Sequence, residues 1–192
     1  MTQLFLIRHG PTHAKTMVGW SDLPADLSDR AALARLADYV PDNACVVSSD
    51  LSRAVATADA LTGERSRLPH EQDLREIHFG HWELRRFDEI EAEDPERLQA
   101  FWQDPGLVRP PGGESWGDMR ARSDAAIDRL IAANDGHALV VVAHFGVILG
   151  QLERALSVPT TEVFAQKIDT LSVTELRLEQ SDWTVGEVNF RP

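Results

Sequence analysis

The amino-acid sequence predicts an α/β fold, a three-layer α/β/α sandwich around a mostly parallel central sheet. Short apolar runs alternate along the chain with segments that carry apolar residues at helical spacing. One run, residues 138–143 (ALVVVA), is apolar throughout, which is typical of a strand buried on both faces. No linker or internal repeat interrupts the alternation, so we expect one domain over residues 1–192.

The first half of the chain begins with an apolar run at 3–7 that predicts a buried strand. A helix follows at 28–40, with Ser28 as its expected N-cap, and further short strands are expected at 44–47 and 67–70. Residues 52–61 between them have helical spacing, whereas residues 72–82 are irregular. A helix is expected over 87–102, with a break at Pro95 because proline cannot donate a backbone hydrogen bond.

The second half opens with residues 104–114, which are rich in proline and glycine and predict a loop. Residues 115–133 and 147–156 have helical spacing and flank the apolar strand at 138–143. The tail from 170 to 190 predicts a hairpin that turns near Ser181 and Asp182. We expect this hairpin to add strands to the central sheet.

Composition excludes several classes of partner. The chain has 19 basic and 31 acidic residues and a net charge of −12, so most of its surface should repel nucleic acids and anionic membranes. No apolar stretch approaches the roughly 18 residues that a transmembrane helix needs. Cys45 is the only cysteine, which rules out an internal disulfide and fits a cytoplasmic location. The oligomeric state is not predicted.

Charged residues follow the predicted strands, where ligands of open α/β sheets bind. Arg8 and His9 follow the first strand, Arg53 begins the helix after the second, Glu76 comes after the possible third, and His144 follows 138–143. Each alone has a structural explanation, such as a hydrogen-bonded histidine or a surface ion pair. Together they predict a positive pocket with one acid, and a phosphate monoester is the simplest ligand for it.

A metal site is the competing interpretation of Glu76, His78 and His81, because their spacing could bring two ligands together. No second motif of carboxylate and histidine supports it, so we expect no metal and no cofactor. His78 and His81 are expected near the pocket mouth. The remaining histidines, His13, His70 and His137, are expected on the surface.

Five blocks of sequence together resemble the histidine phosphatase (phosphoglycerate-mutase-like) superfamily. Residues 6–12 (LIRHGPT) resemble its R-H-G-[EQP]-[ST] signature. The other blocks follow in the order typical of the family: 48–58 (SSDLSRAVATA), 74–83 (LREIHFGHWE), 110–115 (PPGGES) and 141–148 (VVAHFGVI). The match spans nearly the whole chain and is most similar to the compact phosphatase branch.

The resemblance implies that His9 is the nucleophile and forms a phosphohistidine. One imidazole nitrogen would attack phosphorus, while the other donates its proton to a fixed acceptor, for which a backbone carbonyl is expected. The resemblance also implies that Arg8, Arg53 and His144 bind the phosphoryl oxygens, and that Glu76 protonates the leaving alkoxide. Burial would raise the pKa of Glu76 and the arginines would lower it, so its direction stays open.

Further substrate contacts are expected from Thr12, Lys15 and Phe145. Lys15 departs from the family pattern, which often has asparagine there, and Phe145 stands where glycine is common. Leu84 and Leu149 are further departures. Because these changes lie around the central groups, they affect the expected substrate more than the expected reaction.

The expected rim of the pocket comprises Trp20, His78, Trp82 and the loop 109–115, which is a candidate lid. For the two tryptophans, packing in the core or rim competes with stacking on a substrate ring.

The leading hypothesis is a phosphomonoesterase for a small phosphorylated metabolite, similar to α-ribazole phosphatases or to broad-specificity phosphatases. A cofactor-dependent phosphoglycerate mutase is the alternative enzyme, although the chain lacks the long insertion between Glu76 and His144 expected of that group. A non-catalytic binder of phosphorylated ligands and a phosphatase of phosphoproteins are further alternatives.

Overall fold

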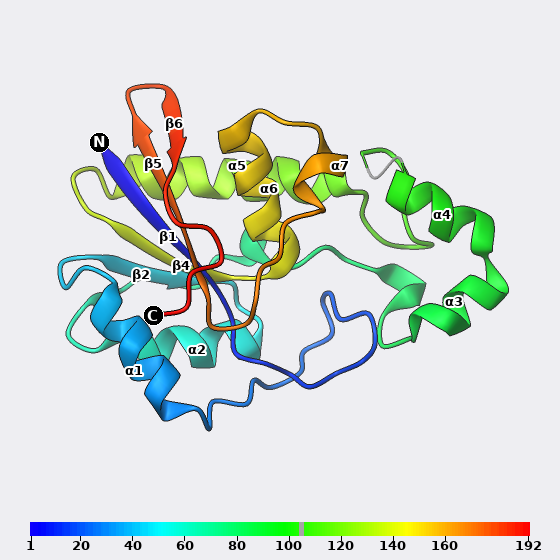
Figure 1. The fold of residues 1–192 in the computed structure, drawn as a ribbon, viewed down its shortest axis with the longest axis horizontal. Helices are drawn as coiled ribbons and strands as arrows, with labels where there is room; N and C mark the ends of the chain where they lie inside the picture. The colour runs from blue at the N-terminus through cyan, green and yellow to red at the C-terminus, as the bar shows by residue number, and fades with distance from the viewer. Residues whose placement is uncertain (104–105) are drawn as a thin grey trace.

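The computed structural model describes residues 1–103 and 106–192 and has the predicted three-layer architecture (Figure 1). Its elements are β1 (Thr2–Arg8), α1 (Arg30–Tyr39), β2 (Cys45–Ser48), α2 (Ser52–Thr62), β3 (Ser66–Arg67), the 3₁₀ turns η1 (Gln72–Leu74) and η2 (Gly80–Trp82), α3 (Phe87–Glu93), α4 (Pro95–Gln103), α5 (Trp116–Ala133), β4 (Leu139–Ala143), α6 (Phe145–Leu156), α7 (Thr160–Val163), β5 (Val173–Glu179) and β6 (Asp182–Val185).

The six strands form one sheet in the order β3-β2-β4-β1-β5-β6. The strands β3, β2, β4 and β1 are parallel, and the tail hairpin of β5 and β6 extends the sheet antiparallel beside β1, as predicted. All five residues of β4 are buried, because β4 lies between β1 and β2 and both of its faces are covered.

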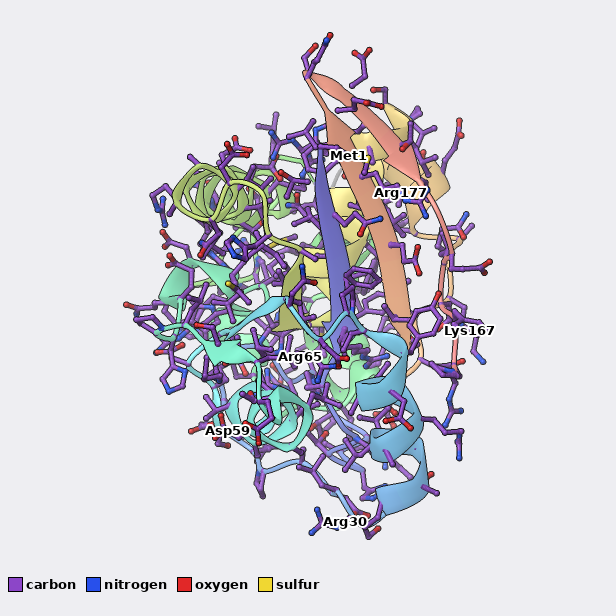
Figure 2. The ribbon with its side chains drawn as sticks, turned by 90° about the vertical axis from the view of Figure 1, so that its left-hand side faces the viewer. Met1, Arg30, Asp59, Arg65, Lys167 and Arg177 are labelled. Carbon is purple, nitrogen blue, oxygen red and sulfur yellow. The ribbon has the colours of Figure 1, made fainter. Side chains whose placement is uncertain are left out.

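Helices cover both faces of the sheet, and alternate strand residues point to each side. Phe5 and Ile7 of β1 pack in one core with α1 and α2, whereas Leu4 and Leu6 pack in the other with α5 and α6. Fully burying a side chain of this size stabilises the fold by about 1.5–3 kcal/mol. In the turned view, the labelled Arg30, Asp59 and Lys167 lie at the periphery of the molecule (Figure 2).

Four local expectations differ from the structure. The N-cap of α1 is Asp29 rather than Ser28, because Asp29 Oδ1 accepts a hydrogen bond from Ala32 N at 3.0 Å. The strand β3 has two residues and begins before the expected range, and α6 begins two residues earlier than expected. The short helix α7 was not predicted, because four residues are too few to show a periodicity.

Pro95 separates two helices, as expected. The helix α3 ends at Glu93, and α4 begins at Pro95, where a missing N–H costs no helical hydrogen bond. Figure 1 shows α3 and α4 at the opposite end of the molecule from the β5–β6 hairpin. In the loop expected at 104–114, Asp104 and Pro105 lie outside the described residues.

Candidate functional site

The carboxyl ends of β1, β2 and β4 meet at one edge of the sheet and bring the predicted residues together. His9 N donates to Ala143 O at 3.1 Å, which fixes the end of β1 beside the end of β4. His9 and His144 then follow these two strands with ring centroids 5.0 Å apart. Parallel pairing of adjacent strands therefore places residues 135 positions apart in the sequence against each other.

The hydrogen bonds of the His9 ring determine its tautomer. Nδ1 lies 2.7 Å from Gly10 O, and a carbonyl oxygen only accepts, so Nδ1 carries the proton. Arg53 Nε donates to His9 Nε2 at 3.2 Å, which requires a lone pair on Nε2. Burial, with the positive charges of Arg53 and Arg8, lowers the pKa of His9 to about 3. The ring is thus neutral at physiological pH and has the backbone-carbonyl acceptor that we expected.

Two arginines lie beside this ring. Arg53, in the first turn of α2, is 1% exposed and donates to Gly19 O at 2.6 Å and Ser21 O at 2.9 Å. Arg8 donates to Ile168 O at 2.6 Å, whereas its buried Nε has no hydrogen-bond partner among the described residues. Burial lowers the pKa of both guanidinium groups. Since the pKa of an arginine side chain starts far above physiological pH, both remain charged, and Arg8 retains a donor for an anion.

His144 has one occupied and one free ring nitrogen. Ser49 Oγ lies 2.6 Å from Nε2, and Nδ1 is buried without a partner in the described parts of the chain. Burial is the main cause that lowers the pKa of His144 well below its usual value, and His9 and the arginines add to it. The neutral ring carries one proton, so the direction of the Ser49 hydroxyl decides whether Nδ1 is a donor.

Glu76 lies between η1 and η2 and is held through both its side chain and its backbone. Its carboxylate accepts from Gly146 N at 3.1 Å and Ile77 N at 2.9 Å, so it also caps the start of α6. Its carbonyl accepts from Trp20 Nε1 and Arg122 Nη2, both at 2.8 Å. Burial raises the pKa of Glu76, because it outweighs these hydrogen bonds and the nearby arginines. This answers the question that the sequence left open.

Gly146 is required for this arrangement. A Cβ atom built on Gly146 would lie 2.4 Å from Glu76 Oε1, well inside van der Waals contact. Any larger residue would push the carboxylate away from the backbone N–H that it caps.

These groups surround a cavity of about 210 Å³, here called the strand-end cavity. Its lining residues are Arg8, His9, Thr12, Ala14, Thr16, Val18, Arg53, Glu76, Phe79 and Phe145. His144 is fully buried behind this lining, against the ring of His9. Lys15 is exposed and is not part of the lining, so its substrate contact stays a prediction. A larger hollow of about 570 Å³ beside Cys45 and His137 contains none of the predicted residues.

Phe145 forms an aromatic wall of the cavity. The guanidinium carbon of Arg8 lies 5.3 Å from the centroid of its ring, within the range of a cation–π interaction. The residue that replaces a common glycine of the family pattern therefore contacts one of the candidate phosphate ligands.

The residues that we expected at the rim of the pocket do not line the strand-end cavity. Trp82 is 2% exposed and packs in the core, which excludes stacking on a substrate. Trp20 stacks under Arg75 at 4.8 Å and meets His78 edge-on at 4.7 Å. Neither His78 nor the exposed His81 lines the strand-end cavity. His13, His70 and His137 are exposed, as expected.

Glu76, His78 and His81 do not form a metal site in the structure. Within residues 1–103 and 106–192, no group of three or more histidine, cysteine, aspartate or glutamate side chains is arranged to hold a metal ion.

The candidate lid is fixed to the neighbouring segment by backbone hydrogen bonds. His81 N donates to Pro111 O, and Glu114 N donates to His78 O, both at 2.8 Å. Gly80 permits this contact, because its φ is +55° and a Cβ there would lie 2.2 Å from Pro111 O. Residues 110–114 are therefore held by backbone hydrogen bonds against residues 78–81, in the segment that follows Glu76.

Two supporting residues were not predicted. The carboxylate of Glu83 accepts hydrogen bonds from the backbone of Gly19 and Ser21, the same residues whose carbonyls hold Arg53. Arg122 on α5 donates to the carbonyls of the Glu76 segment and to Glu114. Glu83 lies inside the block at 74–83, which could have singled it out, whereas no motif marks Arg122.

Leu84 adopts a left-handed conformation with φ of +60°, at the position where the family pattern often has glycine. This departure is therefore accommodated at the cost of local backbone strain.

None of the described helices is long and apolar enough to cross a membrane.

Comparisons with known proteins agree with this geometry. A family model described as "Histidine phosphatase superfamily (branch 1)" matches residues 4–191. The chain is 29% identical over 193 residues to the adenosylcobalamin/alpha-ribazole phosphatase of Salmonella typhimurium, covering 97% of this chain and 90% of that protein. The solved structure of YhfR from Bacillus stearothermophilus superposes with a TM-score of 0.89 at 28% identity, covering 98% of this chain and 97% of that one.

A bifunctional protein of Mycobacterium tuberculosis is 31% identical over 189 residues, covering 90% of this chain. The match covers 49% of that protein, so the chain spans about half the length of these mycobacterial relatives.

Proposed function

Because the chain belongs to the histidine phosphatase superfamily (branch 1), we propose that it hydrolyses a small phosphorylated metabolite through a phosphohistidine on His9. The observation that carries this proposal is the state of the His9 ring. Its Nδ1 proton is held by Gly10 O, and its Nε2 lone pair faces Arg53 in a cavity that also contains Glu76. A neutral nucleophile beside fixed cationic donors and one carboxyl group is suited to phosphoryl transfer.

In the first step, the Nε2 lone pair of His9 forms a bond to phosphorus, and the bond from phosphorus to the ester oxygen breaks. The alkoxide leaves with the proton of Glu76, whose raised pKa favours the protonated acid in the free enzyme. In the second step, Glu76 takes a proton from water as the water oxygen attacks phosphorus. The P–N bond then breaks, and inorganic phosphate and neutral His9 are regenerated.

The phosphoryl oxygens are bound by Arg8, Arg53 and His144. Arg8 Nε and His144 Nδ1 are two of the buried side-chain atoms that lack a hydrogen-bond partner among the described residues, and each would gain one from a phosphoryl oxygen. For His144 this requires the Ser49 hydroxyl to donate to Nε2, so that the proton of the ring lies on Nδ1. Thr12, Lys15 and Phe145 complete the proposed substrate-binding set.

For the substrate, the similarity to the Salmonella enzyme makes α-ribazole phosphate one candidate, beside a broad range of phosphate monoesters. We further propose that residues 1–192 act as one catalytic domain in the cytoplasm, without nucleic-acid or membrane partners. The buried free thiol of Cys45 and the net charge of −12 support this part of the proposal.

Rapid quench in alkaline detergent, after mixing with a monoester labelled in its phosphoryl group, tests the intermediate. The native protein and His137→Ala, a change of an exposed histidine outside the cavity, should both carry acid-labile phosphate. His9→Ala should carry none, and its turnover should fall by about 10⁴-fold or more because the covalent route is lost.

Undiminished activity of folded His9→Ala would disprove the route. Rapid isomerisation of 3-phosphoglycerate in the presence of 2,3-bisphosphoglycerate, with little free phosphate, would instead identify a mutase. Phosphate binding without any turnover would identify a non-catalytic binder.

A further inference from the structure

A second cavity, of about 50 Å³, lies against Glu76 and Ile77 and is otherwise walled by aromatic side chains. We call it the aromatic cavity, and its six aromatic residues are Phe79, Phe101, Trp102, Trp116, Phe145 and Phe164. They come from the η1–η2 region, α4, the starts of α5 and α6, and the end of α7. No sequence motif connects these positions.

Five of the six rings, all except Phe145, form a contiguous edge-to-face cluster. The Phe164 centroid lies 4.8 Å from that of Trp116 and 5.9 Å from that of Trp102, and Trp102 in turn lies 5.2 Å from Phe101. Such contacts stabilise a cluster beyond simple area burial. Trp102 forms the outer wall, because 42% of its surface is exposed. A ring that enters the cavity from solvent would therefore pack against Trp102.

The aromatic cavity borders the strand-end cavity. Glu76, Phe79 and Phe145 line both. On the proposed route, His9 attacks from the strand-end cavity and the leaving oxygen receives its proton from Glu76. The carbon attached to that oxygen must therefore lie near the border that Glu76 forms. The aromatic cavity is the adjoining space into which this carbon chain can continue.

The lining of the aromatic cavity offers little to a polar leaving group. Among the described residues that line the cavity, Glu76 alone has an ionisable side chain. Trp116 Nε1 already donates to Glu153 Oε2 at 2.7 Å. A sugar hydroxyl or a second carboxylate placed there would lose hydrogen bonds to water without replacement, which is costly. An apolar group would instead gain free energy from burial.

We propose that the aromatic cavity is the leaving-group subsite, and that the preferred substrates are phosphate esters of primary alcohols with an apolar or aromatic group next to the ester carbon. This inference rests on the proposed function, because it takes the direction of the leaving group from the pair of His9 and Glu76.

Three esters of primary alcohols test the subsite: benzyl phosphate, methyl phosphate and glycerol 3-phosphate. Benzyl alcohol and methanol have nearly equal acidity, so a difference between their esters reports binding of the ring rather than ease of departure. The native enzyme should hydrolyse benzyl phosphate with a kcat/KM at least about 10-fold above that of methyl phosphate, as a small apolar pocket provides. Glycerol 3-phosphate should be no better than methyl phosphate.

Trp102→Ala and Phe164→Ala should each reduce the preference for benzyl over methyl phosphate to less than about threefold. Inhibition by inorganic phosphate, which occupies only the strand-end cavity, should not change. Phe87→Ala is the matched control, because Phe87 is 49% exposed on α3 and does not line the aromatic cavity. It should retain the full preference, and circular dichroism should show all three variants folded.

The possible failures are distinguishable. If glycerol 3-phosphate is hydrolysed as well as benzyl phosphate, or if neither variant changes the preference, the subsite is wrong while the phosphatase proposal stands. If no ester releases phosphate and no phosphohistidine forms, the proposed function itself is wrong.

Discussion

The two cavities that meet at Glu76 are built in opposite ways. The strand-end cavity takes Arg8 and His9 from the end of β1 and Arg53 from the first turn of α2. Its carboxyl group, Glu76, comes from the loop between η1 and η2. Hydrogen bonds fix these side chains, for example His9 to Gly10 and Glu76 to Gly146. The aromatic cavity takes its rings from helices and loops on one side of the sheet, and packing between the rings fixes them together with the hydrogen bond from Trp116 to Glu153.

This difference shows how one fold can use one set of residues for the reaction and another set for the choice of substrate. Phosphoryl transfer needs donors and a nucleophile at defined positions, which a parallel sheet edge supplies. Recognition of an apolar group needs volume and shape, which side chains on surrounding helices can supply and vary without moving the sheet. Changes in the first cavity should therefore affect all substrates, and changes in the second only some.

Among the changes that test the difference between the two cavities, the largest effect should come from Glu76→Gln, at their border. The variant cannot protonate the leaving oxygen, so kcat/KM for benzyl phosphate should fall by about 10²–10⁴-fold. For p-nitrophenyl phosphate, kcat/KM should fall by less than about 10-fold, because the p-nitrophenolate ion leaves without needing a proton. Steady-state assays of both esters measure the contrast, and equal losses would show that Glu76 is not the donor.

Ser49→Ala should lower kcat/KM by about 10-fold, because on the proposed route the hydrogen bond with Ser49 keeps the proton of His144 on Nδ1. The loss should be the same for benzyl and methyl phosphate, since Ser49 acts through the strand-end cavity. Ser48→Ala is the matched control: Ser48 is equally buried, but its hydroxyl accepts from Arg67 at 2.6 Å. A loss that depends on the leaving group would remove the distinction between the cavities.

The stability of the protein should depend on pH through His9. Its pKa is about 3 in the folded state and about 6.5 when unfolded, so below pH 6.5 the unfolded chain binds a proton that the folded chain does not. From pH 7 to pH 5 the free energy of unfolding should therefore fall by about 2 kcal/mol through His9. Urea denaturation at both pH values measures the free energy of unfolding. The decrease of about 2 kcal/mol should be absent in His9→Asn and retained in Phe101→Leu, a change in the aromatic cavity. If the free energy of unfolding of His9→Asn depends on pH as strongly as that of the native protein, the prediction is wrong.

Glu76 should act in the opposite direction on stability, because its pKa is raised in the folded state. The contribution of Glu76 to the free energy of unfolding is present at low pH. It is lost as the pH rises from the pKa of Glu76 in the unfolded chain through its pKa in the folded protein. Glu76→Gln should therefore have a smaller loss of stability over that range than the native protein.

Lys15→Met should have the smallest effect. Lys15 is exposed and outside the cavity lining, so its ammonium can attract a phosphate dianion only through solvent. We expect KM to rise by about threefold at low salt, with kcat unchanged and the effect lost at high salt. A large fall in kcat would place Lys15 inside the strand-end cavity during catalysis.

Residues that follow strands directly could be predicted from local pattern. Arg8, His9 and His144 follow the apolar runs of β1 and β4, and Arg53 begins the helix after β2. Glu76 is different, because β3 has only two residues and ends at Arg67, nine positions earlier. The expectation that Glu76 follows a strand directly was therefore wrong, whereas the resemblance of the block at 74–83 also singled out Glu76 and does not depend on a strand end.

The aromatic cavity could not be predicted, because its walls depend on how α4 and α7 pack against the rest of the chain. The role of Ser49 was missed for a similar reason: its partner His144 is 95 residues away, and only the pairing of β2 with β4 brings them together. Long-range packing of this kind leaves no periodicity in the sequence.

The hydrogen bond from Arg53 Nε to His9 Nε2 has a consequence for the catalytic cycle. Once Nε2 is bonded to phosphorus it has no lone pair, so this N–H loses its acceptor at the moment a phosphoryl oxygen arrives beside it. The Nε–H of Arg53 would exchange His9 Nε2 for a phosphoryl oxygen, so it would have a hydrogen-bond acceptor before and after the transfer. On the proposed route, the phosphoenzyme therefore forms and breaks without leaving this buried N–H without an acceptor. In the resting enzyme, His9 Nε2 occupies the N–H that a phosphoryl oxygen would later accept from.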